Sequence, residues 1–312
     1  MEGGNEIRKD AIENRFVIVA PGRGDRPGGG LLRSSPGRHG LFACRLCSRR
    51  IDREESLLEI PDGRGGWRVK VVANKFPILS RDSRVAYGRH ELIIETPRGD
   101  RPFESFSVPE IESVLSAFSS RIEALRRDRK LKFVTVFKNV GPAAGASKAH
   151  AHSQLIASAV VPSAVKDLQS RVGAATKRGG CPYCGLVKSE SRGPRLVAAT
   201  KSVIAIAPFA SVFPYEVWIM PRRHRCSLTG LTAIERRDLS KTYGLVAGFL
   251  ARRRLDWNMA IEEIFGAEEM HCGLRIFPRG TIWAGMELET GMVTNPIPPE
   301  RAAAEYREFL SP

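Results

Sequence analysis

The sequence predicts an α+β protein made of two tandem units, each with an antiparallel-rich sheet and flanking helices. A Cys-x-x-Cys pair occurs twice, with starts 137 residues apart, and a strand-like histidine segment also occurs twice, 121 residues apart. Between them, strand-like runs and one long amphipathic helix follow in the same order each time. A duplicated block keeps its element order while its loops change length. We expect units at residues 1–165 and 166–312.

Strands of the first unit are predicted by short runs of β-branched and aromatic residues. These runs are residues 16–19, 67–73, 91–96 and 133–137. A helix start is predicted at Ser107, which is followed by Pro109 and Glu110. Apolar residues then recur at helical spacing from Ile111 to Leu125. Between the first strand and the first cysteine pair, a stretch rich in Gly, Pro and Arg (residues 22–40) predicts a loop.

The second unit repeats this order. Strand-like runs lie at residues 203–207, 215–220, 260–264 and 271–276. An amphipathic helix is expected at about residues 231–251, where apolar residues again follow helical spacing. The segment at 215–220 answers the segment at 90–95 in the first unit.

Composition limits the classes of function. The chain has 312 residues, of which 42% are hydrophobic and 27% charged, so it can build packed cores and wholesale disorder is excluded. The net charge of +15 predicts an anionic partner, either a phosphorylated small molecule or nucleic acid. Nucleic acid is disfavoured because no aromatic residues interleave the basic ones. The start has no apolar signal segment and no long apolar run follows, so we expect a cytoplasmic protein without a membrane span.

The cysteine pairs predict metal sites. In a cytosolic chain, Cys-x-x-Cys is typical of metal ligands or a redox couple, and buried small residues are the plain alternative. A structural zinc site takes four Cys or His ligands, and each unit has two cysteines and two histidines for one. The expected ligands are Cys44, Cys47, His90 and His150 in the first unit and Cys181, Cys184, His224 and His271 in the second. At the second site Cys272 competes as a ligand, and Gly273 stands where a further histidine would be.

The segment around His152 predicts chemistry at phosphorus. Residues i and i+2 of a strand point to the same face, so His150 and His152 lie together. A neutral imidazole is a good nucleophile toward phosphorus, although two metal ligands would show the same spacing. The small-residue turn before them brings backbone N–H groups, Ser147 and Lys148 toward phosphate oxygens. Gln154, again at i+2, can hydrogen-bond the same phosphate.

Residues 138–154 (KNVGPAAGASKAHAHSQ) closely resemble the active-site signature of the galactose-1-phosphate uridylyltransferase family in the histidine-triad superfamily. The resemblance runs nearly end to end. It includes residues 6–10, 15–21, 23–27, 74–77, 90–97, 285–291, Asn295 and 299–300. It implies two histidine-triad-like units, a homodimer and two structural zinc sites per chain.

The resemblance also implies a role for each matching residue. His152 would attack the α-phosphorus of a nucleoside diphosphate sugar, expel sugar 1-phosphate and hold the nucleotidyl group until a phosphorylated acceptor collects it. The other implied roles are phosphoryl contacts for Gln154 and Ser147, the phosphate turn for Asn139 and Gly145, nucleotide contacts for Asn74 and Lys75, and ligand contacts across the dimer for Arg23 and Arg26. Cys44, Cys47, His90 and His150 match a structural zinc site. The second cysteine pair is more like that of two-zinc ADP-glucose phosphorylases.

Two departures from the family pattern stand out. Ala151 replaces a proline between the histidines, which leaves both imidazoles in place. Gly273, opposite His152 in the repeat, has no nucleophile, so one active site per chain is expected. The predicted activity is double-displacement transfer between a nucleoside diphosphate sugar and a sugar 1-phosphate, as in galactose metabolism. The alternatives are an ADP-glucose phosphorylase, a dinucleoside polyphosphate phosphorylase or hydrolase, and a non-catalytic zinc-stabilised nucleotide or nucleic-acid binder.

Overall fold

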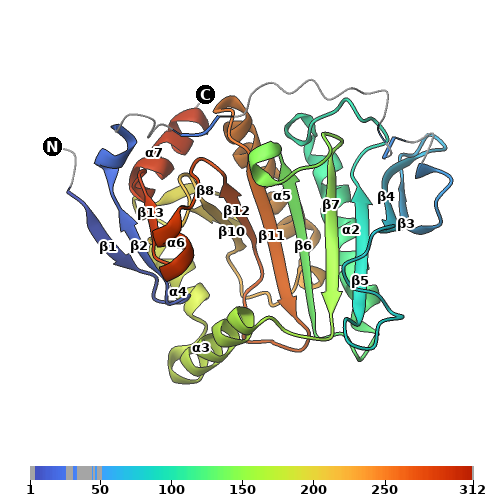
Figure 1. Ribbon diagram of the computed structural model, residues 1–312, viewed down its shortest axis with the longest axis horizontal. Helices are drawn as coiled ribbons and strands as arrows, with labels where there is room; N and C mark the ends of the chain where they lie inside the picture. The colour runs from blue at the N-terminus through green and yellow to red at the C-terminus, as the bar shows by residue number, and fades with distance from the viewer. Residues whose placement is uncertain (1–3, 26–30, 34–43, 45, 48–50, 311–312) are drawn as a thin grey trace.

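A ten-stranded sheet crosses the whole molecule (Figure 1). The computed structural model describes residues 4–25, 31–33, 44, 46–47 and 51–310. In spatial order the strands are β3 (Ser56–Pro61), β4 (Trp67–Ala73), β5 (Gly88–Ile94), β7 (His152–Ser158), β6 (Phe133–Val140), β11 (Trp257–Ile264), β12 (Leu274–Pro278), β10 (Val217–Pro221), β9 (Val203–Ile206) and β8 (Leu196–Ala199). All neighbours in this sheet are antiparallel. A smaller sheet joins β1 (Glu6–Lys9), β2 (Phe16–Val19) and β13 (Val293–Asn295).

The two units meet at the centre of the large sheet. There β6 and β11 pair along their full length, from Phe133 opposite Ile264 to Val140 opposite Trp257. Five strands of each unit extend outward from this junction in the same order, which is the tandem α+β architecture that the sequence predicts. The predicted boundary after residue 165 falls inside a helix, and the division into separate folding units stays a prediction.

Two long helices cover one face of the sheet. They are α2 (Val108–Arg126) and α5 (Ala233–Arg252), which lie behind the strands in Figure 1. The other helices of the described residues are α3 (Ser163–Gly179), α4 (Pro182–Glu190), α6 (Gly285–Thr290) and α7 (Pro299–Leu310), together with the short 3-10 helices η1 (Pro21–Asp25), η3 (Phe103–Ser105), η4 (Pro142–Ala144) and η5 (Leu228–Gly230). No helix among the described residues is both long and apolar enough to cross a membrane.

The main core fills the space between the sheet and these two helices. Val136 and Leu155 from the first unit and Val217 and Ile276 from the second are fully buried in it. Successive side chains of a strand point to opposite faces. When Leu155 faces the helices, its neighbours along β7 therefore face the other side of the sheet, where they are free to line a pocket.

The sequence predicts most of these elements. Each of the expected strands overlaps an observed one, and both expected long helices are present. The sequence patterns missed β1, β3, β8, β13 and the helices α3, α4, α6 and α7. Within the loop expected at 22–40, residues 21–25 form η1, whereas 26–30 and 34–40 lie outside the described residues.

Candidate active site

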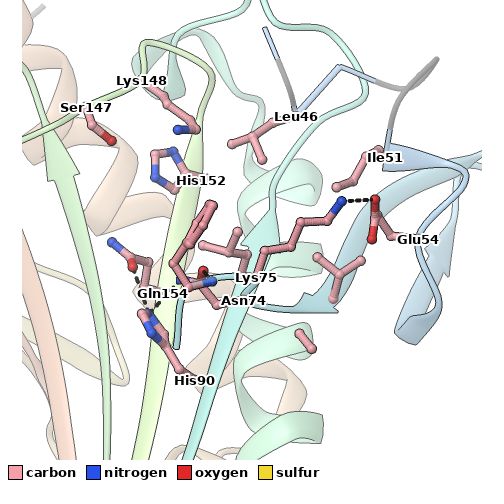
Figure 2. A pocket seen from close by; sticks show the side chains of 14 residues that line it. Leu46, Ile51, Glu54, Asn74, Lys75, His90, Ser147, Lys148, His152 and Gln154 are labelled. Carbon is pink, nitrogen blue, oxygen red and sulfur yellow. Dashed lines mark hydrogen bonds and ion pairs between the residues drawn. The ribbon is translucent and has the colours of Figure 1, made fainter. Parts of the chain in front are cut away.

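A pocket of about 600 Å³ opens over β4, β5 and β7 on the face of the sheet away from the long helices. Figure 2 shows its lining. His152 and Gln154 come from β7, Ser147 and Lys148 from the loop before it, and His90 from β5. The remaining lining residues are Leu46, Ile51, Glu54, Val72, Ala73, Asn74, Lys75, Phe76 and Leu92. Polar groups from β7 thus face a wall that is largely apolar.

The ring of His152 is fixed by its own chain. Its Nδ1 lies 2.7 Å from the carbonyl oxygen of His150, which can only accept a hydrogen bond, so Nδ1 carries the proton. In the neutral ring Nε2 then keeps its lone pair. Burial lowers the pKa of His152, which favours this neutral form. The arrangement suits an imidazole that acts as a nucleophile.

His90 lies in this pocket and not with the cysteines. Its Nδ1 accepts a hydrogen bond from the backbone N–H of Ile78 at 3.3 Å, and its Nε2 lies 2.9 Å from Gln154 Oε1 and 3.0 Å from Asn74 Nδ2. Both ring nitrogens are therefore occupied, and His90 holds the amide of Gln154 toward the pocket floor (Figure 2).

The prediction that His90 is a metal ligand beside His150 is therefore wrong. The reason is strand register. Ile94, and not His90, lies opposite His152 on the neighbouring strand. Four residues of strand separate His90 from that point, roughly 13 Å at about 3.3 Å per residue. The sequence does not show this register, because it depends on how β5 pairs with β7.

The turn between β6 and β7 is anchored by the second unit. Gly141 has φ +85°, and a Cβ there would lie 2.0 Å from Asp256 Oδ1. Asp256 accepts a hydrogen bond from the backbone N–H of Ala143 at 2.7 Å. Asn258 donates to both Asn139 Oδ1 and the carbonyl of Ala144 at 2.8 Å. Asp256, just before β11, and Asn258, on β11, were missed in the sequence, because nothing local links them to a turn more than a hundred residues earlier.

The predicted substrate contacts fall into three groups. Asn74 and Lys75 line the pocket, and Lys75 Nζ lies 2.6 Å from Glu54 Oε1 across its mouth (Figure 2). Asn139 lines a smaller adjoining cavity of about 90 Å³ beside His152.

Two other predicted contacts, Gly145 and Arg23, are not among the residues that line the pocket. Gly145 is in the turn, with φ +77°. Arg23 lies in η1, whose neighbouring strand β2 is at the opposite end of the molecule from β4 (Figure 1). Arg26 lies outside the described residues.

A Cys/His cluster lies next to the start of β7. It contains Cys44, Cys47 and His150, whose ligand atoms lie within 4.8 Å of one another. His150 Nδ1 is 3.3 Å from Cys44 Sγ, while its Nε2–H donates to the carbonyl of Thr96 at 2.7 Å. Gly99 faces the cluster, and a Cβ there would lie 2.7 Å from Cys47 Sγ.

A second cluster contains all four residues expected for it: Cys181, Cys184, His224 and His271. Cys184 Sγ lies 3.6 Å from Nδ1 of each histidine. Burial and the neighbouring Cys181 thiol raise the pKa of Cys184 to about 11, and burial lowers the pKa of His271 to about 4. Cys272 does not join this cluster, because it is buried in the main core.

Both clusters fit a metal ion. In each, the imidazole Nε2–H donates to a backbone carbonyl, as His224 does to Glu268 and His271 to Pro221, so Nδ1 presents its lone pair to the thiols. Such an outer hydrogen bond is the usual support of a metal-binding histidine. The described residues thus provide three donors at one cluster and four at the other.

Comparison with known proteins assigns the chain to a family. Residues 72–162 match the family described as galactose-1-phosphate uridyl transferase, N-terminal domain. ADP-glucose phosphorylase of Arabidopsis thaliana is 30% identical over 332 residues, which cover 97% of this chain and 92% of that protein. Galactose-1-phosphate uridylyltransferase of Thermotoga maritima is 28% identical over 334 residues, covering 97% of this chain and 98% of that protein.

The fold agrees with this assignment. The crystal structure of the Arabidopsis ADP-glucose phosphorylase with bound ADP-glucose superposes with a TM-score of 0.85 at 28% identity, covering 98% of this chain and 99% of that one. The two chains are alike over nearly their whole length, and the matched family segment contains His150 and His152. The similarity is therefore not confined to one part of the chain. The chain belongs to the galactose-1-phosphate uridylyltransferase family, which includes ADP-glucose phosphorylase, and it is a nucleotidyltransferase of that family.

Proposed function

We propose that the chain transfers the nucleotidyl group of a nucleoside diphosphate sugar in two displacements through His152. The observation that carries the proposal is the fixed ring of His152, whose Nδ1–H donates to the carbonyl of His150 while Nε2 is left to react. Nε2 attacks the α-phosphorus, the bond from that phosphorus to the bridging oxygen breaks, and sugar 1-phosphate leaves. An acceptor oxygen then attacks the same phosphorus and Nε2 leaves.

Three groups of the pocket stabilise negative charge on the phosphoryl oxygens. Ser147 offers a hydroxyl, Lys148 an ammonium and Gln154 an amide N–H, and all three line the pocket around His152. Donors that already face the place where charge develops lower the barrier without reorganising. His90 supports this role of Gln154 because it holds the amide oxygen at 2.9 Å, which turns the amide nitrogen the other way.

We also propose that both Cys/His clusters hold structural Zn²⁺, which would supply cross-linking of loops to the sheet. At the first cluster Cys44 and Cys47 would be tied to His150. Leu46, between these cysteines, lines the pocket, and it is 3% exposed. The cluster residues therefore position part of the apolar wall as well as the strand that carries His152.

Among donors, we favour an ADP-sugar, with inorganic phosphate as acceptor. The Arabidopsis ADP-glucose phosphorylase supports this choice, since it matches this chain over nearly its whole length. The second candidate is uridylyl transfer to a sugar 1-phosphate, because the Thermotoga galactose-1-phosphate uridylyltransferase covers as much of the chain. The apolar wall of Leu46, Ile51, Val72 and Leu92 suits the flat face of either base.

We further propose a cytoplasmic homodimer. None of the six cysteines forms a disulfide, as expected in a reducing compartment. The helix η1, which contains Arg23, follows β2 in the chain, and β2 lies at the opposite end of the molecule from β4 (Figure 1), which supports a role for Arg23 and Arg26 at the pocket of a second copy. Cross-linking in solution, followed by restoration of activity on mixing Arg23→Ala and His152→Ala chains, tests this arrangement.

The covalent intermediate gives the decisive experiment. The protein is incubated briefly with ADP-glucose, UDP-glucose, UDP-galactose or GDP-mannose without acceptor, and its intact mass is measured. A gain of one nucleotidyl group that is absent in His152→Ala names the base. Acid lability of the adduct distinguishes a phosphoramidate on histidine from an ester on Ser147. Absence of any adduct and any turnover with all four donors contradicts the proposal.

The acceptor follows from the labelled protein. Addition of phosphate to the adenylylated chain is expected to release ADP, whereas glucose 1-phosphate or galactose 1-phosphate releases a nucleotide sugar if the second candidate is right. The faster of the two reactions identifies the physiological class.

A further inference from the structure

Three buried polar residues lie under His152 on the helix face of the sheet. Lys138 on β6 is 2% exposed, Glu95 just after β5 is 2% exposed, and Ser153 on β7 is fully buried. Lys138 Nζ donates to Glu95 Oε2 at 2.5 Å, and Ser153 Oγ donates to Glu95 Oε1 at 2.5 Å. We call these three residues the buried triad.

The buried triad is tied to the backbone that carries the nucleophile. Lys138 Nζ also donates to the carbonyl of His152 at 3.2 Å, and the backbone N–H of Glu95 donates to the carbonyl of Ala151 at 3.2 Å. The ring of Phe103 lies 4.7 Å from Lys138 Nζ and covers the ion pair. These hydrogen bonds hold the backbone of residues 151–153 from the helix face of the sheet, while the His152 ring projects to the pocket face.

Stability alone does not explain such an arrangement. A buried ion pair loses hydration on both sides, and replacement by apolar residues of similar volume is often neutral or stabilising. The same position could be filled by a hydrocarbon core. An ion pair kept in this place thus needs a reason other than stability.

The second unit supplies that hydrocarbon alternative. Leu274 follows Gly273 as Ser153 follows His152, and it lies opposite Ile219 on β10. When the strand pairing is extended by one or two residues, Ile261 lies opposite Leu274, as Lys138 lies opposite Ser153. In the same way Pro221 takes the position of Glu95. All three replacements are buried and apolar. The unit with His152 therefore has three polar residues at these buried positions, and the unit with Gly273 has three apolar ones.

We infer that Lys138, Glu95 and Ser153 are positioning residues that fix the backbone at residues 151–153, so that the His152 ring meets phosphorus in the reactive orientation. This inference rests on the proposed function, because His152 must be the nucleophile. It predicts a loss in the rate of covalent attack with little change in nucleotide binding, since the buried triad lies on the other face of the sheet from the pocket. Reacting groups that are displaced by about an ångström lose roughly a hundredfold in rate.

The test is a single-turnover measurement of adduct formation with ADP-glucose and, in parallel, UDP-glucose. The main variant is Lys138→Met/Glu95→Met, which removes both charges and leaves neither one unpaired. The matched control is Arg121→Met/Glu91→Met, which removes another ion pair on β5, at 2.7 Å with Glu91 2% exposed, that does not touch His152. Zinc content and melting temperature are measured on both.

We expect the main variant to lower the maximal rate of adduct formation about 10- to 100-fold, with the half-saturating concentration changed by less than about twofold. The control should react at the wild-type rate. If the main variant reacts as fast as the control, the positioning role is overturned while the proposed function stands. If the wild type forms no adduct and shows no turnover, both are overturned.

A milder variant covers the case in which the main variant does not fold. Ser153→Ala keeps the ion pair and removes one hydrogen bond to Glu95. Slowing by about fivefold, the equivalent of one hydrogen bond, supports the role. A wild-type rate for Ser153→Ala overturns it.

Discussion

The two halves of the ten-stranded sheet hold the same elements in the same order, yet their pockets differ. The pocket over β4, β5 and β7 measures about 600 Å³, whereas the pocket around Gly273, over β10, β11 and β12, measures about 180 Å³. The first has His152 and Gln154 at its floor, and the second has Gly273 and Arg275. The two halves thus share a scaffold, and the side chains at the pocket floor distinguish them.

The second pocket is closed by its own residues. Arg275 donates to the Tyr183 hydroxyl at 3.1 Å and to Glu13, and its guanidinium lies 4.8 Å from the ring centroid of Trp218. A Cβ at Gly273 would lie 2.8 Å from the backbone oxygen of Ile219. Side chains therefore fill this pocket, and the backbone leaves no room for a side chain at position 273. Packing thus explains why no histidine stands there.

Moving the histidine from the first unit to the second should have the greatest effect. We expect His152→Ala/Gly273→His to form no adduct and to lose transfer activity by at least roughly 10⁴-fold, because the backbone at Ile219 leaves no room for the new ring. Gly273→His alone should keep one adduct per chain and lose about 1–3 kcal/mol of stability from overpacking. Intact mass and thermal unfolding measure both. Two adducts per chain in the single variant would contradict the argument.

The clusters offer the next contrast. The second has four donors among the described residues and the first has three. We expect a chelator to remove the first metal ion faster, and removal of the second to lower the melting temperature more, because a site with four protein ligands contributes directly to folding. Zinc content followed during dialysis measures the order. The control is Cys226→Ser, which changes an exposed cysteine outside both clusters. Equal rates of loss would remove the distinction.

Gly99 gives a sharper test of the first cluster. A Cβ at this position would lie 2.7 Å from Cys47 Sγ and 3.1 Å from His150 Nδ1, so Gly99→Ala should displace ligands there and leave the second cluster intact. We expect the bound zinc to fall from two to about one per chain at limiting free metal. The matched control is Gly248→Ala on α5, where a Cβ meets nothing within 4 Å. It should keep both ions and gain about 0.5–1 kcal/mol of stability.

Much of the catalytic half could be predicted from the sequence because it depends on local spacing. The i, i+2 relation of His150, His152 and Gln154 is a property of any strand, and the structure places His152 and Gln154 together at the pocket. The helix start after Ser107 follows in the same way from capping chemistry.

What failed depends on register and long-range contacts. Matching residues 215–220 to 90–95 aligns Met220 with Glu95, but strand pairing aligns Met220 with Ile94, one residue away. A shift of one residue moves a side chain to the other face of a sheet, so the match could not show the apolar counterpart of Glu95. His90 was misassigned because the sequence does not show how β5 pairs with β7. Asp256, which anchors the phosphate turn, carries no local signal at all.

The starts of the two long helices should differ slightly in what they contribute to the free energy of unfolding. At α5 the Thr232 hydroxyl accepts the N–H of Glu235 at 3.2 Å, and the Thr232 N–H donates to the Glu235 carboxylate at 2.8 Å. At α2 the N–H and hydroxyl of Ser107 both donate to the Glu110 carboxylate at 2.8 Å, and the serine oxygen accepts no hydrogen bond from a helix N–H.

We therefore expect Thr232→Ala to cost about 1 kcal/mol of unfolding free energy, the usual value for a lost cap, and Ser107→Ala less than about 0.5 kcal/mol. Urea unfolding of the two variants beside the wild type measures the difference. The effect of Ser107 acts through Glu110, because burial alone would raise the pKa of that carboxyl but hydrogen bonds from Arg101 and Ser107 lower it to about 2. That contribution is present above pH 4.5 and is lost as the pH falls toward 2. The cost of Ser107→Ala should thus be greatest near neutral pH and fall as the pH approaches 2, and equal costs of the two variants at pH 7 would show that the serine oxygen caps α2 after all.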